Sequence, residues 1–106
     1  KYLLTKGINK LQGVVVMNVE GKDVVDKLSA YLNHNISLPD LVDWAETAMM
    51  DGEFIGEDWE TVRDIVARIG LADVREFGLN WEDCGDALFE LGYRTEVRIL
   101  DASGLN

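Results

Sequence analysis

The side chains best suited to covalent chemistry are few in this chain. His34 is the only histidine and Cys84 the only cysteine among 106 residues. A nucleophilic thiol needs a base beside it, so catalysis would require Cys84 and His34 to meet in space. Cys84, however, falls on the apolar side of an expected helix, where a thiol usually packs as an unreactive hydrophobic group. With no other catalytic motif visible, we expect a core role for Cys84 and a protein that is not an enzyme.

Carboxylates are abundant, and one acidic stretch, residues 51–60, invites comparison with calcium-binding loops. An EF-hand loop beginning at Asp51 needs an oxygen ligand at its fifth position and a Glu at its twelfth, but these are Ile55 and Val62. A structural zinc site normally uses several His or Cys ligands, which the chain lacks. We therefore expect no cofactor and a mobile, solvated loop between helices. Binding of a divalent cation or a small ligand by carboxylates of this loop stays open as an alternative.

Four helices are expected to position these groups. Apolar residues recur at helical spacing over four stretches, about 21–33, 37–51, 57–69 and 80–91. Two of these stretches begin with a cap residue followed three positions later by an acid, which is typical of a helix start. The cap residues are Ser37 and Asn80. Within the third helix, the i,i+4 spacing of Asp64 and Arg68 predicts an ion pair, and a short helix or turn is expected over 73–77.

Two strands are expected at the ends of this helical region. Residues 13–19 are rich in β-branched residues, and residues 93–100 alternate between polar and apolar side chains. We predict that these strands pair. The expected fold class is α+β, mainly α: a four-helix cluster flanked by short N- and C-terminal strands, in the order β-α-α-α-α-β. Residues 1–16 form a basic N-terminal extension that can include part of the first strand, and residues 17–106 form one acidic, helix-rich domain.

The net charge of −10 is unevenly distributed along the sequence. Residues 1–36 carry five Lys and three acids, whereas residues 37–106 carry five Arg and seventeen acids, a net charge of −12. Such a surface repels nucleic acids and anionic membranes and attracts basic partners. The longest uncharged apolar run, residues 14–17, is far too short to cross a bilayer. With a single cysteine and no signal-like segment, the expected location is the cytoplasm.

The acidic field and a few apolar side chains outside the expected core indicate a protein partner. Helical wheels place Met50 and Phe89 off the core, and Phe54 lies in the acidic loop. With neighbouring carboxylates, these residues make up the predicted partner-binding set: Asp43, Glu46, Met50, Phe54, Glu57, Asp86, Phe89 and Glu90.

The sequence therefore favours a small, bacterial-type protein-interaction module that binds a basic protein. The most specific version of this hypothesis is an immunity-, antitoxin- or inhibitor-like protein, because dense negative charge speeds association with a basic partner such as a nuclease. The alternative from a different class is a homodimeric structural domain that uses the two terminal strands at a two-fold interface, since an uncovered apolar strand edge tends to pair with another copy.

Overall fold

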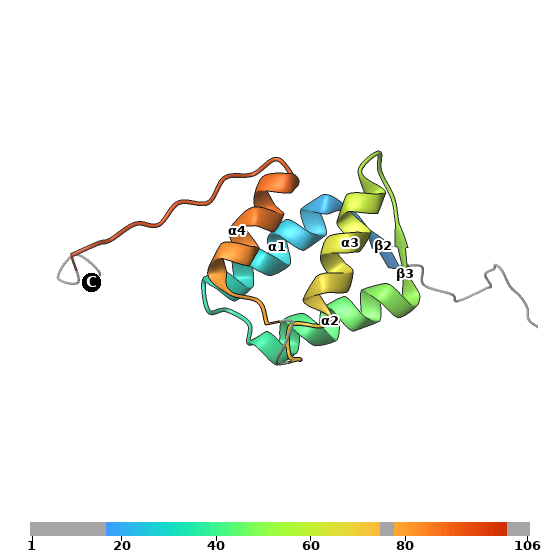
Figure 1. Cartoon of the computed structure of the whole chain (residues 1–106), viewed down its shortest axis with the longest axis horizontal. Helices are drawn as coiled ribbons and strands as arrows, with labels where there is room; N and C mark the ends of the chain where they lie inside the picture. The colour runs from blue at the N-terminus through green and yellow to red at the C-terminus, as the bar shows by residue number, and fades with distance from the viewer. Residues whose placement is uncertain (1–16, 75–77, 102–106) are drawn as a thin grey trace, which may run out of the picture.

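The computed structural model describes residues 17–74 and 78–101. Within these ranges the chain forms four helices and two short strands (Figure 1). In chain order they are β2 (Met17–Val19), α1 (Gly21–Leu32), α2 (Leu38–Asp51), β3 (Gly52–Phe54), α3 (Trp59–Ile69) and α4 (Trp81–Glu90). The mainly helical α+β class is thus confirmed. The predicted extension over residues 1–16 lies outside the described residues, as does most of the turn predicted over 73–77.

Two helices, α2 and α4, begin directly after the cap residues that the sequence predicts, whereas α3 begins at Trp59, two residues later than expected. The Ser37 hydroxyl accepts a hydrogen bond from the Asp40 backbone N–H at 3.2 Å, and the Asn80 side-chain oxygen accepts one from Asp83 N–H at 2.8 Å. Each acid returns a bond to the backbone N–H of its cap residue, which satisfies two donors that a helix start otherwise leaves unpaired. These capping boxes fix the first turns of α2 and α4.

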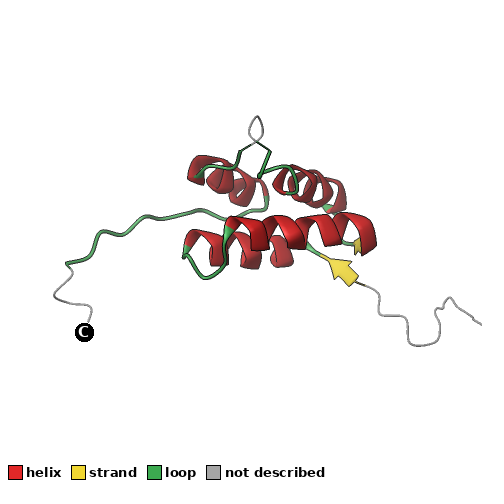
Figure 2. Ribbon diagram, turned by 90° about the horizontal axis from the view of Figure 1, so that it is seen from below, coloured by secondary structure: helices red, strands yellow, loops and turns green. Residues whose placement is uncertain are grey.

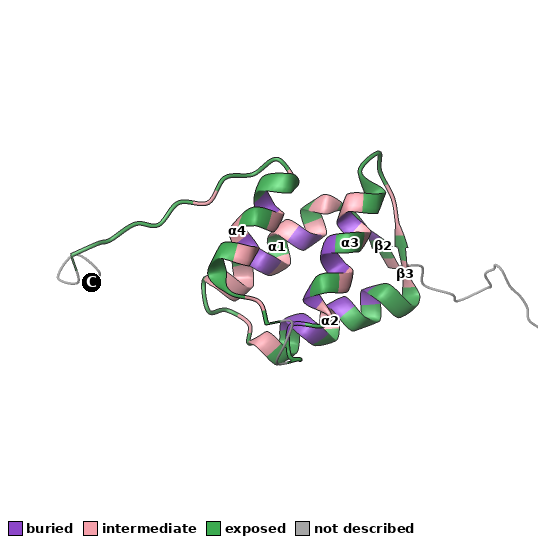
Figure 3. Ribbon diagram, viewed as in Figure 1, coloured by how far each residue is buried: buried purple, intermediate pink, exposed green. Residues whose placement is uncertain are grey.

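The helices lie in two layers, α1 beside α2 and α3 beside α4 (Figure 2). The core lies between the layers, where buried side chains of all four helices meet (Figure 3). Its fully buried members include Val24, Leu28, Leu41, Ala45, Val62, Val66 and Cys84. The placement of Cys84 in the core is confirmed. No helix among the described residues is both long and apolar enough to span a membrane.

The strand pairing differs from the prediction. β2 pairs in parallel with β3, so that Met17 lies opposite Gly52 and Val19 opposite Phe54. The predicted pairing of the two terminal strands is therefore wrong within the described residues, and residues 93–100 are not part of a sheet. β3 follows α2 directly and occupies the edge of β2. The loop predicted over 51–60 is accordingly a strand in its first half.

Candidate partner-binding groove

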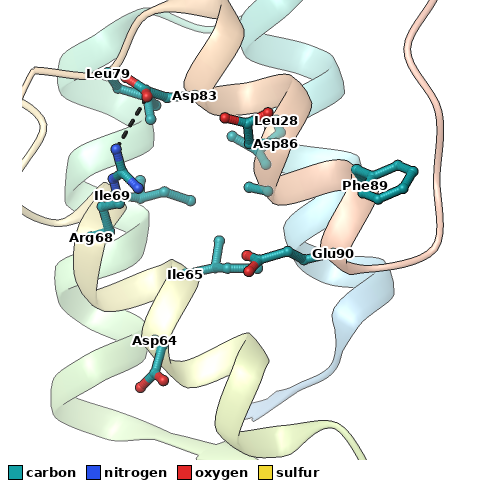
Figure 4. Close-up of a pocket in the computed structure, with 11 residues that line it drawn as sticks. Leu28, Asp64, Ile65, Arg68, Ile69, Leu79, Asp83, Asp86, Phe89 and Glu90 are labelled. Atoms are coloured by element: carbon teal, nitrogen blue, oxygen red, sulfur yellow. Dashed lines mark hydrogen bonds and ion pairs between the residues drawn. The ribbon is translucent and has the colours of Figure 1, made fainter.

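A groove separates α3 from α4 on one face of the helical body (Figure 4). Its volume is about 530 Å³, which is enough to hold several side chains of a partner. The groove exists because α3 packs mainly against α2, and α4 packs against α1, so the two helices of this layer are not closely packed on each other. The apolar side chains that line it come from three helices and from the segment before α4: Leu28, Ile65, Ile69, Leu79 and Ala87.

One end of the groove is closed by an ion pair between its two walls. The Arg68 guanidinium donates to an Asp83 carboxylate oxygen at 3.1 Å (Figure 4). The other Asp83 oxygen accepts the Asn80 backbone N–H at 3.0 Å. Asp83 is therefore engaged both in capping α4 and in joining it to α3, and its carboxylate partly offsets the positive charge of the largely exposed Arg68.

The remaining carboxylates along the groove have different surroundings. Asp86 and Glu90 lie one helical turn apart on α4, are both exposed and both line the groove, and the Glu90 carboxylate extends toward α3 (Figure 4). Neither has a cation within 4.0 Å among the described residues. On the opposite wall, the ion pair that Asp64 forms within residues 17–74 and 78–101 is with its neighbour Arg63, at 3.2 Å and exposed to solvent. Exposed pairs of this kind contribute little, so Asp64 keeps most of its negative potential.

The groove thus combines an apolar floor with a negative rim. Four carboxylates line it against a single guanidinium. Phe89, which is 75% exposed, lies at its outer edge on α4. The arrangement can bind a group that is both apolar and positively charged. Among the described residues that line the groove, Arg68 is the one positively charged side chain, and it is already paired with Asp83.

The structure divides the eight predicted partner-binding residues among different surfaces. Asp86, Phe89 and Glu90 come together at the groove. Three others lie on the exposed face of α2, namely Asp43, Glu46 and the 81% exposed Met50, and Glu57 is exposed before α3. Phe54 differs from the prediction, because its pairing in β3 brings the side chain against the core, where it is half-buried.

Sequence reasoning missed the α3 wall of the groove. It predicted that Asp64 and Arg68 pair with each other, but Arg68 reaches across to Asp83 instead. The i,i+4 spacing signals only that a pair is possible within one helix. The competing carboxylate lies fifteen residues away along the chain, and only the packing of α4 brings it near.

The groups considered for covalent or metal chemistry do not form a second site. Cys84 is fully buried, and burial, with a smaller contribution from the Asp83 charge, raises the pKa of its thiol to about 11. His34 is exposed, at a positive φ of 62° in the turn after α1. Among the described residues, no three His, Cys, Asp or Glu side chains come together as metal ligands.

The sequence matches no protein-family model, and no curated protein or solved structure matches it significantly. The groove between α3 and α4 is therefore the main observation on which a function can be argued.

Proposed function

We propose that this protein is a non-enzymatic interaction module that binds a basic, amphipathic segment of a partner protein in the groove between α3 and α4. The observation that carries the proposal is the pair of unpartnered carboxylates, Asp86 and Glu90, beside an apolar floor. These two residues have no capping or ion-pairing role among the described residues, unlike Asp83 in the same helix.

The partner's chemistry follows from the two surfaces that it must match. Leu or Ile side chains of the partner would cover the partly exposed Leu79 and Ala87, while the floor beneath them, Ile65 and Ile69, is already buried. Lys or Arg side chains would lay their aliphatic stems on the same floor and place their charged ends beside Asp86 and Glu90. A helix with alternating apolar and basic turns offers both groups at suitable spacing.

The charge of the whole chain supports the same partner class. A net charge of −10 raises the rate of encounter with a basic protein and lowers that with nucleic acid. An immunity-, antitoxin- or inhibitor-like role in the cytoplasm is the most specific form of the proposal, because such proteins mask a basic partner surface.

A labelled model peptide tests the proposal. The probe is a short helical peptide with Leu every third or fourth residue and Lys on the flanking positions, and fluorescence anisotropy measures its Kd. We expect binding that weakens steeply between about 50 and 500 mM NaCl, since the rim contributes through charge. The variant D86N/E90Q should weaken binding about 10-fold, which corresponds to about 1.4 kcal/mol.

Two controls separate this groove from general acidity. The variant D43N/E46Q removes the same charge from the exposed face of α2 and should change the Kd by less than about 2-fold, because these carboxylates lie outside the groove. A peptide with Glu in place of every Lys should not bind. If D86N/E90Q and D43N/E46Q weakened peptide binding equally, only the net charge would matter, and this result would contradict a site specific to the groove.

A further inference from the structure

The segment that follows α4 is extended and leaves the helical body. Gly92 turns the chain at a positive φ of 93°, and the Tyr93 N–H donates to the Leu88 carbonyl at 2.8 Å. From there residues 94–100 run outward (Figures 1 and 2). No backbone hydrogen bond joins them to any other described residue. Their backbone donors and acceptors are thus available along the whole segment.

This segment has the composition of a strand, and its apolar side chains are not covered. Thr95, Val97 and Ile99 alternate with charged residues, which is the pattern of a half-buried strand. Val97 is 64% and Ile99 95% exposed, and most of the segment is coloured as exposed in Figure 3. An isolated strand with a free backbone edge and an apolar face is the structural element most prone to pair with another strand.

We infer that residues 94–100 pair antiparallel with the same segment of a second copy of this chain, with Val97 opposite Val97 of that copy. In this register each Glu96 faces an Arg98, and each Thr95 faces an Ile99, so two opposite-charge pairs form at once. Within one chain, Glu96 and Arg98 already attract each other at 3.5 Å, but both are largely exposed and their pairing is weak.

The neighbouring registers are poorer. A two-fold axis at Glu96 would place Glu96 opposite Glu96 and Arg94 opposite Arg98. Each charged side chain would then face a side chain of the same charge, and the two would repel each other. An axis at Arg98 would place the two Arg98 side chains together. An axis at Thr95 would match Arg94 with Glu96, but it would need residues 90–92, which form the end of α4 and its turn. The register at Val97 alone uses the whole free segment with complementary charges.

A surface for the apolar face of the paired strands lies next to the segment. A second groove runs between the segment, α1 and α4, and its apolar lining consists of Val97 together with Val25, Leu32, Leu79, Trp81 and Leu88. Two strands alone are marginally stable in water, and packing against an apolar helix surface makes them persist. Asp86 and Glu90 do not line this second groove, so the inference does not depend on the proposed partner function.

Cysteine cross-linking tests the register in the full chain. V97C should form an intermolecular disulfide under mild oxidation, because facing Cβ atoms lie about 5 Å apart. I99C is the matched control: it lies on the same face and is more exposed, but its two copies would be about 13 Å apart. Faster cross-linking of V97C supports the register. Equal rates, or faster cross-linking of I99C, would overturn it.

Charge reversal supplies an independent test by sedimentation velocity. The native chain should dimerise at tens of micromolar, and R98E should raise the dimer dissociation constant by about 10-fold, because it places Glu opposite Glu twice. The double reversal E96R/R98E restores complementary pairs and should recover native dimerisation to within about 3-fold. Circular dichroism confirms that the helices stay folded. A native chain that remains monomeric at about 100 μM, or a double reversal as weak as R98E, would rule out the pairing.

Discussion

The thiol of Cys84 shows how position decides what a reactive side chain can do. It is fully buried in the core, and its pKa of about 11 keeps it protonated at neutral pH. A nucleophile must be a thiolate and must be reached by its substrate. Neither condition holds, so Cys84 acts as a packing residue.

The raised pKa of Cys84 predicts a loss of stability at high pH. The ordinary value for the thiol is 9.0, and the folded chain titrates it near 11. Between these values the unfolded chain binds fewer protons than the folded chain, so the free energy of unfolding falls as pH rises, by about 2–3 kcal/mol in all. Below pH 9 the full stability is present. Urea unfolding at about pH 8 and pH 11 measures the change.

C84A is the control, because tyrosines and lysines also titrate in this range. The native chain should have a higher free energy of unfolding than C84A at pH 8, and this difference should be about 2–3 kcal/mol smaller at pH 11. An advantage that stays constant with pH would show that the thiol titrates normally in the folded chain.

Single side chains were predictable where one helix alone decides their surroundings. The helical wheel placed Met50 and Phe89 off the core, and they are 81% and 75% exposed. It could not place Phe54, whose burial depends on the pairing of β3 with β2. Nor could it show that Arg68 leaves its own helix to reach Asp83. Contacts between elements distant in sequence carry no local signal.

At the scale of elements, the same distinction separates the helices from the strands. A capping box joins residues three apart, so Ser37 and Asn80 signal helix starts without any tertiary information. The strands β2 and β3 have three residues each, which is too short for a recognisable sequence pattern. They pair because α2 brings the chain back so that β3 lies beside β2. The strand predicted from the alternation of residues 93–100 is not formed, because no partner within the described residues pairs with this segment.

The junction of α2 and β3 depends on a glycine, which gives a prediction at this scale. A Cβ added at Gly52 would overlap the Ala48 carbonyl oxygen and come within 2.9 Å of a Val19 methyl group. G52A should therefore shift β3 away from β2 and lower the free energy of unfolding by about 1–3 kcal/mol, measured by urea denaturation. G78A is the matched control, since no described atom lies within 4 Å of the added group there. Equal effects of the two variants would contradict the close packing at Gly52.

For the whole molecule, the structure sorts the acidic excess into two kinds of carboxylate. Asp23, Asp40 and Asp83 each accept the backbone N–H of a helix cap residue, where a negative charge is stabilised by the helix dipole. Asp86 and Glu90 have no such role, and Glu90 stands at the C-terminal end of α4, where the dipole opposes a negative charge. The composition gives the total charge. Only the folded structure shows which carboxylates stabilise the fold and which ones destabilise it.

This distinction predicts opposite effects of neutralising charges on one helix. D86N/E90Q should raise the free energy of unfolding by a few tenths to about 1 kcal/mol, because it relieves repulsion within an acidic chain and at the end of α4. The gain should disappear near 1 M NaCl, where such charges are screened. The variant D83A should instead lower the free energy of unfolding by about 1 kcal/mol or more, since the substitution removes a helix cap contact and the bond to Arg68. Thermal and urea unfolding at low and high salt measure both effects. If D86N/E90Q were destabilising, the two carboxylates would have a structural role, and the case for a docking surface kept at a cost in stability would be lost.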